Sequence, residues 1–350
     1  MERRQGAAGA GSLAGLAVRD LEALVDPPYR AKQIFRWVQA RGAVSYDAMT
    51  DVPKAVREAL AARLPVRSSR VAESHRSDDG TVKLLLCLAD GEKVECVLIP
   101  EGDRRTACIS TQVGCGVGCV FCASGAQGVI RNLEAFEIVE QVLWLRDAGG
   151  ASGDQGARLT NIVVMGMGEP LHNVESLVRA LRLVQDPEGI DLGSRRITIS
   201  TSGPRKGFEE LLASGLRTNL AISLHAATDD LRRRLVPRGG TADVAGLSGM
   251  AREWFEATGR DVTFEYVLLS GINDRDEDAE ALARLAGRHR NVNLIPMNPV
   301  SFAPELKAPS PERVERFAGI LRKAGVVVHA RRQRGDDVAA ACGQLRLSRP

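Results

Sequence analysis

Short apolar runs alternate with amphipathic segments over most of this chain, and that alternation constrains its fold more than any other feature. From Thr106 onward the strand candidates are ACIST, NIVVMG, RRITIST, TNLAISL, VTFEYVLL, VNLIPM and VVVHA. Helices are predicted between them, at about 134–148, at about 174–184, and from Ser310 to the residue before Gly325. Six or seven β/α units in series predict a parallel sheet, either doubly wound or curled into a full or partial barrel.

The first hundred residues differ from the rest in composition and in the spacing of apolar residues. Residues 1–13 are rich in Gly, Ala and Ser and are predicted to be a disordered tail. The accessory segment, residues 14–100, begins with helical spacing of apolar residues and continues with KLLLCL and KVECVLI. Asp-Gly pairs at 79–80 and 90–91 flank the first of these runs and predict a hairpin or a small meander. Residues 101–345 then form the core.

Composition limits the class of protein. With 47 Lys and Arg against 44 Asp and Glu, the net charge is only +3, which excludes a strongly basic nucleic-acid coat but permits a local basic patch. Seven cysteines, three of them between residues 115 and 122, do not suit a secreted disulfide framework. No apolar run reaches the roughly 18 residues of a membrane span. We therefore expect a cytoplasmic protein that keeps its thiols reduced.

The three clustered cysteines lie in GCGVGCVFC, residues 114–122, on a glycine-rich loop after a strand candidate. Three thiolates spaced C-x3-C-x2-C can ligate three irons of a cubane cluster and leave the fourth iron open to an outside ligand. Glycines at 114, 116 and 118 let the backbone wrap closely around such a core. The alternative is a zinc site, which needs a fourth ligand. Cys108, on the preceding strand, is the candidate for that position.

The triplet resembles the signature of radical S-adenosylmethionine (radical SAM) enzymes, and other stretches narrow the resemblance. MGMGEP at 165–170 looks like the Gly-Gly-Glu-Pro element of that superfamily. ACISTQVGC, SLHA at 223–226, NLIPMNP at 293–299, RGDDVAAACGQL and the N-terminal YRAKQIFRWVQARGAVSYDAMTDVPKAVREAL together resemble the RlmN/Cfr family. Its members are radical SAM RNA methyltransferases that act on adenine ring carbons. The resemblance extends from about Gly15 to Leu345.

This resemblance implies a fold and a reaction. The fold is α/β, a radical SAM partial (β/α)6 barrel with an N-terminal helical plus small β accessory domain. In the reaction, Cys342 takes a methyl group from one SAM, and a second SAM supplies the radical that activates that group. Cys108 then releases the product through a transient disulfide with Cys342. Glu95 matches the proposed proton acceptor; its alternative interpretation is an exposed strand residue. For Cys342 the alternative is a buried small hydrophobe.

The resemblance also implies the binding residues. Cys115, Cys119 and Cys122 would hold a [4Fe-4S] cluster. SAM, used twice per turnover, would contact seven residues: Gly168, Glu169, Ser200, Ser223, Leu224, His225 and Asn298. Each lies at or just after a predicted strand end, where barrel enzymes place their sites. Cys87 and Cys96 lie in apolar strands and are expected to be core residues.

The implied substrate is RNA: an adenine of 23S rRNA and the adenine next to the anticodon of tRNA, methylated at C2. A flavodoxin or ferredoxin-type electron donor and a monomeric state are expected. Candidate RNA contacts are the arginine pair at 195–196 and the runs at 232–234 and 331–334. The accessory segment, residues 14–100, is expected to be an RNA-binding domain. Three alternatives stay open: C8 methylation of the same ribosomal adenine, radical SAM chemistry on a small molecule, and a non-enzymatic iron–sulfur or zinc RNA-binding module.

Overall fold

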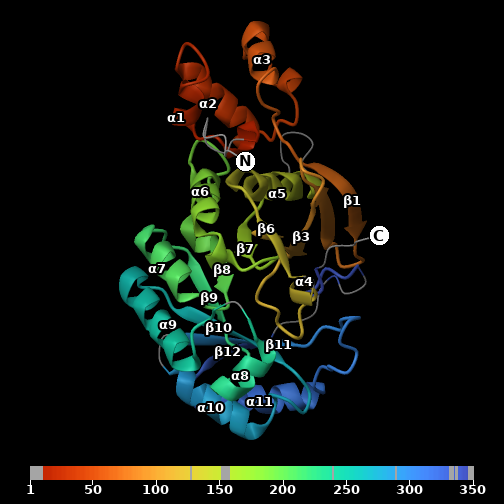
Figure 1. Ribbon diagram of the computed structural model, residues 1–350, viewed down its shortest axis with the longest axis vertical. Helices are drawn as coiled ribbons and strands as arrows, with labels where there is room; N and C mark the ends of the chain where they lie inside the picture. Colours follow the sequence, from red (N-terminus) through yellow and green to blue (C-terminus); the bar gives the residue numbers. More distant parts are fainter. Residues whose placement is uncertain are drawn as a thin grey trace, which may run out of the picture.

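One ten-stranded sheet organises the protein (Figure 1). The computed structural model describes residues 11–126, 128–150, 158–238, 240–287, 290–330, 335 and 338–345. Residues 1–10 of the predicted tail and the arginine run at 331–334 therefore lie outside the described residues. Ser12 and Leu13, which were predicted to belong to the disordered tail, are instead buried. The strand order is β1-β2-β3-β4-β7-β8-β9-β10-β11-β12, so the sheet has two open edges at β1 and β12.

The core is parallel from β4 to β12, which confirms the predicted α/β architecture of an open, partial barrel. All seven predicted core strands are present. Their bounds are β4 Arg104–Cys108, β7 Asn161–Val164, β8 Ile197–Thr201, β9 Asn219–Ser223, β10 Val262–Leu268, β11 Arg290–Pro296 and β12 Val327–Ala330.

Helices connect these strands, as crossovers between parallel strands require. Their bounds are α4 Ala123–Ala126, α5 Ala135–Ala148, α6 Val174–Gln185, α7 Arg205–Ala213, α8 Asp229–Leu235, α9 Val244–Thr258, α10 Asp276–Ala286 and α11 Pro311–Lys323. The start of α11 follows its sequence signals: the Ser310 hydroxyl accepts a hydrogen bond from the amide of Arg313, and Pro311 is the first helical residue. The largest fully buried side chains, Trp254, Tyr266, Phe264 and Phe317, lie between these helices and the sheet.

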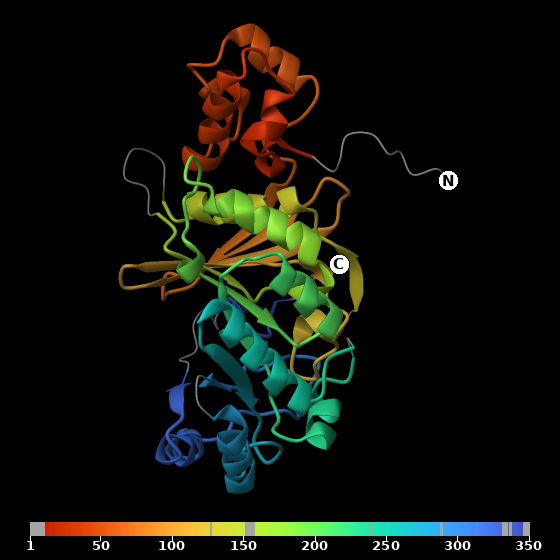
Figure 2. The same cartoon turned by 90° about the vertical axis from the view of Figure 1, so that its left-hand side faces the viewer.

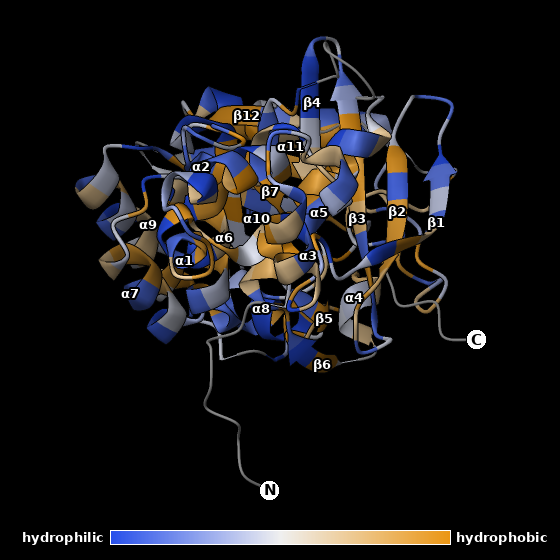
Figure 3. Ribbon diagram, turned by 90° about the horizontal axis from the view of Figure 1, so that it is seen from above, coloured by the Kyte–Doolittle hydropathy of each residue, from blue (hydrophilic) through white to orange (hydrophobic). Residues whose placement is uncertain are grey.

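The β part of the accessory segment is a meander, not an isolated hairpin. Its strands are β1 Arg70–Arg76, β2 Val82–Cys87 and β3 Lys93–Glu101. They pair antiparallel with one another, and β3 pairs antiparallel with β4, so that Val97 lies opposite Cys108. The sheet therefore runs without a break across the predicted boundary at residue 100. The edge strand β1 is exposed along its whole length and is polar (Figure 3), which protects an open sheet edge from pairing with other chains.

The N-terminal helices stand at one end of the molecule, above α5 and far from β10–β12 (Figures 1 and 2). They are α1 Val18–Glu22, α2 Tyr29–Phe35 and α3 Lys54–Ala61. Gly15 lets the N-terminal segment pack directly on α5, because a Cβ at this position would lie 2.6 Å from the Cβ of Phe136. No helix in the described part of the chain is long and apolar enough to cross a membrane.

A buried carboxylate fastens this helical segment to the core. Glu140 on α5 is fully buried, and its two oxygens accept hydrogen bonds from hydroxyls and amides of the N-terminal segment. The Ser12 hydroxyl donates to Glu140 at 2.6 Å, and the amides of Ser68 and Ser69 each donate to it at 2.8 Å. The hydroxyls of Ser68 and Ser69 also donate to this carboxylate. Hydrogen bonds to a buried charged group are among the stronger ones, because each donor is costly to leave unpaired.

We predict that Glu140→Ala lowers the free energy of unfolding by about 3 kcal/mol, since it leaves several donors unsatisfied. It should also expose the segment around residues 12–69 to proteolysis. Urea denaturation and limited proteolysis measure both effects. The control is Glu175→Ala on the exposed face of α6, expected within about 0.5 kcal/mol of the wild type. Equal stability of the two variants would contradict the assigned role of Glu140.

Candidate functional site

The carboxyl ends of the parallel strands gather nearly all the predicted site residues at one edge of the sheet. The cysteine loop follows β4, Gly168 and Glu169 follow β7, and the later members lie at or after the ends of β8, β9 and β11. Residues as far apart in the sequence as Cys115 and Asn298 become neighbours, because strands that run parallel end at the same edge. The sequence placed these residues at strand ends, and the structure brings them together.

The cysteine loop is shaped by a small two-stranded sheet. After β4 the chain forms β5, Gln112–Gly114, which pairs with β6, Val129–Asn132, and the Cys115 amide donates to Gly128 O at 2.9 Å. Gly114 is required here: its φ is +79°, and a Cβ would lie 2.1 Å from Gly128 O. Gly118 also has a positive φ, +68°. Gly116 does not, so only two of the three glycines singled out in the sequence meet a backbone requirement.

Cys115, Cys119 and Cys122 are reduced and lie against an apolar group that includes Phe121 and Leu235. Burial, aided by the charges of Cys122 and Glu169 and opposed by a hydrogen bond from the Val117 amide, raises the pKa of Cys115 to about 12. Burial likewise raises the pKa values of the other two thiols. Three close thiols in an apolar pocket repel one another once ionised. A cationic metal centre removes that penalty, because it binds the thiolate form.

This donor set fits an iron–sulfur cluster. Within the described ranges, no three His, Cys, Asp or Glu side chains converge on a single ion position. In a cubane each thiolate binds a different iron, so its ligands need not converge in that way. Cys108, the fourth ligand of the zinc alternative, lies on β4 and not on the loop.

Glu169 holds the strand ends together. Its carboxylate is buried and accepts from Thr201 Oγ1 at 2.6 Å, the Ser202 amide at 2.8 Å, Ser202 Oγ at 2.7 Å and the Leu171 amide at 2.9 Å. These four bonds use the four lone-pair positions of a carboxylate. Any contact of this residue with a ligand therefore involves its backbone or the exchange of one of these bonds. The preceding glycine has a φ of +103°, and a Cβ there would lie 2.6 Å from Gln112 Cβ.

Ser200, Ser223, Leu224 and His225 lie side by side on the next two strand ends. The hydroxyls of Ser200 and Ser223 are 3.4 Å apart. Leu224 is fully buried. His225 has a φ of +59°, and its Nδ1 accepts from the Val267 amide at 3.1 Å, which places the proton of the neutral ring on Nε2. Burial, with the charge of Arg232, lowers the pKa of His225 to about 3, so the ring is neutral near pH 7.

Arg232 was predicted to contact RNA, but its buried position beside the thiols corrects that prediction. Its guanidinium is buried and donates to Ser223 O at 2.8 Å, to Ser202 O at 2.7 Å and to Leu224 O. Its charge partly opposes the rise that burial causes in the pKa of the nearby Cys119. Arg232 thus crosslinks the ends of β8 and β9 beside the thiols and is not available to RNA. Nothing in an arginine triplet at 232–234 distinguishes the buried member from the exposed ones.

The C-terminal strap, residues 338–345, lies across the same edge. Asn298 Nδ2 donates to Cys342 O at 2.7 Å. The strap also bonds to the cysteine loop, since the Ala123 amide donates to Gly343 O at 2.7 Å and Ser124 Oγ to Leu345 O at 2.6 Å. Cys342 is exposed, which excludes the interpretation as a buried hydrophobe. A residue more than 200 positions after the cysteine loop is thereby held next to it.

Glu95 and Cys108 share one face of the sheet. Cys108 pairs with Val97, and Glu95 lies two residues from Val97 on β3, so the three side chains point the same way. Glu95 is buried, not exposed, and forms an ion pair with Lys83 at 3.2 Å. Lys83 Nζ also donates to Ala339 O of the C-terminal strap at 3.3 Å. Lys83, which the sequence analysis did not single out, therefore links the predicted proton acceptor to the segment that carries Cys342.

Neither Cys108 nor Cys342 forms a disulfide in this structure. Cys96, on the opposite face of β3, is fully buried, and burial raises the pKa of its thiol well above the usual value, which confirms it as a core residue. Cys87 is half-buried.

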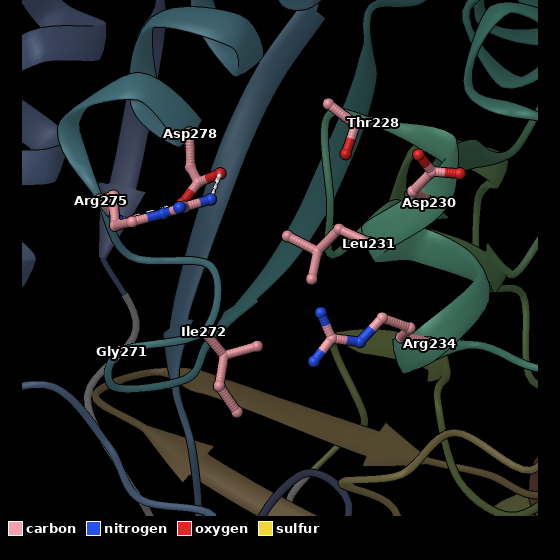
Figure 4. Close-up of a pocket in the computed structure, with 8 residues that line it drawn as sticks. All are labelled: Thr228, Asp230, Leu231, Arg234, Gly271, Ile272, Arg275 and Asp278. Carbon is pink, nitrogen blue, oxygen red and sulfur yellow. Dashed lines mark hydrogen bonds and ion pairs between the residues drawn. The ribbon is translucent and has the colours of Figure 1, made fainter.

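A hollow of about 340 Å³ lies at the same edge of the sheet, between the start of α8 and the segment before α10 (Figure 4). Arg234 points into it beside Leu231 and Ile272. Two acidic side chains, Asp230 and Asp278, balance the charges of the two arginines that line the hollow, Arg234 and Arg275.

Comparison with known proteins agrees with this arrangement. The profile of the radical SAM superfamily matches residues 109–286, and that of the ribosomal RNA large subunit methyltransferase N-terminal domain matches residues 16–66. A protein of Symbiobacterium thermophilum named probable dual-specificity RNA methyltransferase RlmN is 45% identical over 340 residues, covering 95% of this chain and 91% of its own. The dual-specificity RNA methyltransferase RlmN of Solidesulfovibrio magneticus is 43% identical, covering 96% of both.

The crystal structure of a radical SAM methyltransferase from Sphaerobacter thermophilus superposes with a TM-score of 0.91 and 46% sequence identity. The superposition covers 96% of this chain and 99% of that one. The resemblance therefore extends over the accessory segment, the core and the strap, and not over the superfamily core alone.

Gly343 controls the position of the C-terminal strap. Its φ is +84°, and a Cβ would lie 3.1 Å from Phe121 O, so we predict that Gly343→Ala costs about 1–2 kcal/mol locally. Hydrogen exchange of the amides in residues 338–345 should accelerate. The control is Gly319→Ala on α11, where the φ is not positive and no atom lies within 4 Å of a Cβ. Unchanged exchange in the Gly343 variant would show that the strap is not held by this contact.

Proposed function

Because this chain belongs to the RlmN family of radical SAM methyltransferases, we propose that it methylates C2 of an adenine in 23S rRNA and C2 of the adenine next to the anticodon in tRNA. Relatives with 43–45% identity are named dual-specificity RNA methyltransferases. The matched N-terminal domain, named for ribosomal RNA methyltransferases, supports an RNA substrate over a small molecule.

The observation that carries the proposal is the docking of Cys342 beside the cysteine loop. Adenine C2 is an electron-poor carbon without a lone pair, so direct polar transfer of a methyl group from SAM cannot reach it. The reaction needs a methyl carrier close to a source of radicals. An exposed thiol on a strap whose backbone is held by Asn298 and by the residues that follow Cys122 meets that requirement.

The family uses SAM and a [4Fe-4S] cluster. In this chain Cys115, Cys119 and Cys122 would hold three of the irons. When bound, the cluster supplies the electron that cleaves SAM into methionine and a 5′-deoxyadenosyl radical. We propose that two SAM molecules are used per turnover, one as methyl donor and one as radical source.

The SAM pocket in this proposal lies along the strand ends after β7, β8, β9 and β11. The backbone of Gly168 packs against Gln112, and Glu169 holds the ends of β7 and β8 together at the edge where SAM would bind. Ser200, Ser223, Leu224, His225 and Asn298 are the further contacts. A neutral His225 with its proton on Nε2 offers a hydrogen-bond donor near pH 7.

The remaining roles fall to Cys342 on the C-terminal strap and to Glu95 and Cys108, which share one face of the sheet. Cys342 carries the methyl group and presents its carbon to the adenine. Glu95 accepts the ring proton, and Lys83 at 3.2 Å holds the carboxylate in place. Cys108 attacks the sulfur of Cys342, which releases the methylated RNA and leaves a disulfide that is later reduced.

A flavodoxin or ferredoxin-type protein is proposed as the electron donor. We propose that the enzyme acts as a monomer in the cytoplasm, where thiols stay reduced and RNA is found.

Replacement of the resolving cysteine tests the mechanism directly. In anaerobic reactions with SAM and reductant, Cys108→Ala is expected to accumulate protein covalently bound to RNA, because the thioether to Cys342 is not released. The adduct should survive both denaturing gel electrophoresis and thiol reductant. Cys342→Ala should form no adduct, and Cys87→Ala, the control, should turn over at the wild-type rate. An active Cys342→Ala variant would refute the proposal.

The position of the methyl group requires a separate measurement. Mass mapping of 23S rRNA and tRNA from a deletion strain should show loss of 2-methyladenosine, restored by the wild-type gene. Loss of an 8-methyl mark would assign the chain to the C8 branch of the chemistry, and loss from rRNA alone would remove the tRNA half of the proposal.

A further inference from the structure

The amino ends of four neighbouring core strands each follow an arginine. Arg158 precedes β7, Arg195 and Arg196 precede β8, Arg217 precedes β9, and Arg260 precedes β10, each within three residues of the strand. The strands are neighbours in the sheet and run parallel, so these side chains meet at the edge opposite to the cysteine loop. In the sequence they are spread over about a hundred positions, and only the pair at 195–196 stood out.

A cavity of about 630 Å³ lies among them, which we name the basal pocket. Arg158, Arg195, Arg196 and Arg260 line it, together with Thr160 and Ser194. Arg195 and Arg196 are exposed. The pocket thus offers several guanidinium groups on an open surface, while its two hydroxyls already donate to Asn161 and Gln185.

The positive charge of the basal pocket is largely uncompensated. Its one acidic lining residue, Asp191, pairs with Arg158 at 3.5 Å. Within the described residues, Arg195, Arg196 and Arg217 take part in no ion pair, and Arg260 makes a single side-chain hydrogen bond, to Asn219 Oδ1 at 3.3 Å. The pKa of Arg260 is lowered, mainly by burial and to a smaller extent by repulsion from the positive charges of Arg195 and Arg217. Like charges held this close indicate a site for an anion.

The hollow of about 340 Å³ at the edge that carries the cysteine loop has no such excess of positive charge. There Arg275 is paired with Asp278 at 3.0 Å, and Asp230 pairs with the neighbouring Arg233 (Figure 4 shows the first pair). An excess of positive charge is therefore a property of the basal pocket and not of every arginine-containing depression on this surface.

The basal pocket also adjoins the N-terminal helices. Its wall includes the loop before β8, and the same loop carries Glu188, which accepts from Arg36 Nε at 2.7 Å. Gly189 of that loop packs so closely on Gln39 that a Cβ would lie 2.9 Å from the Cβ of Gln39. The five residues of β8 separate this pocket from the catalytic edge by about 17 Å. A folded RNA is large enough to contact both edges.

We propose that the basal pocket binds backbone phosphates of the RNA substrate, away from the nucleotide that reacts. The assignment rests on the proposed function and adds to it a second contact region. Arginine suits it because the guanidinium fork matches phosphate oxygens. Such contacts position an RNA without reading its sequence. They also explain how a chain with a net charge of only +3 holds a polyanion: the charge is concentrated where it is needed.

The test uses the full-length, cluster-loaded enzyme and two RNAs, a tRNA transcript and an unmodified 23S rRNA fragment. The variant is Arg195→Gln/Arg196→Gln. We expect its affinity for RNA to fall about tenfold, and the slope of log affinity against log salt, from about 50 to about 200 mM, to decrease by one to two. Cluster absorbance and binding of SAM should stay at wild-type values, because neither residue touches that edge.

The control variant, Arg252→Gln/Lys323→Gln, removes two exposed charges from α9 and α11 and should leave affinity and slope unchanged. A wild-type slope in the Arg195/Arg196 variant, with wild-type enzyme methylating the same RNA, would overturn the basal pocket assignment alone. Binding of millimolar inorganic phosphate there without any change in RNA affinity would overturn it as well, in favour of a small anion. Failure of the wild type to methylate RNA would overturn the proposed function and this assignment together.

Discussion

The continuous parallel hydrogen bonding from β4 to β12 is the constraint on which the rest of the structure depends. It aligns the carboxyl ends of all core strands at one edge and their amino ends at the other. The first edge collects buried thiols, a carboxylate with four donors and a buried arginine; the second collects arginines with few partners. Both arrangements follow from strand direction, because residues just after and just before parallel strands have no other place to gather.

Two long-range attachments complete the site. At the open side of the sheet, the meander β1–β3 extends the core by pairing with β4, and so brings Glu95 onto the face of Cys108. The C-terminal strap then crosses the same edge and fixes Cys342 between Asn298 and the cysteine loop. Lys83 joins the two attachments, since it bonds both to Glu95 and to the strap. The proposed methyl carrier, proton acceptor and resolving thiol thereby come from three separate parts of the chain.

Buried charges serve the architecture as much as the chemistry. Glu140 fastens the N-terminal helices through hydroxyls and amides, and Glu169 ties together the ends of β7 and β8. Arg232 bonds three carbonyls beside the thiols. Each is a buried charged group, so its position is fixed by the partners that compensate the cost of burial. This rigidity is what a site that controls a reactive radical requires.

The sequence by itself determined the parallel core, the strand positions, the cysteine loop and the family resemblance, because these depend on local periodicity and on the spacing of residues within one loop. It also predicted that Cys96 is a core residue, for the same reason. Only the tertiary structure decided which arginine of the run at 232–234 is buried, that Lys83 faces Glu95, and that the sheet continues across residue 100. It also decided that arginines a hundred positions apart meet in one pocket. Those outcomes depend on strand order and on the direction of side chains across the sheet, and neither leaves a pattern in the local sequence.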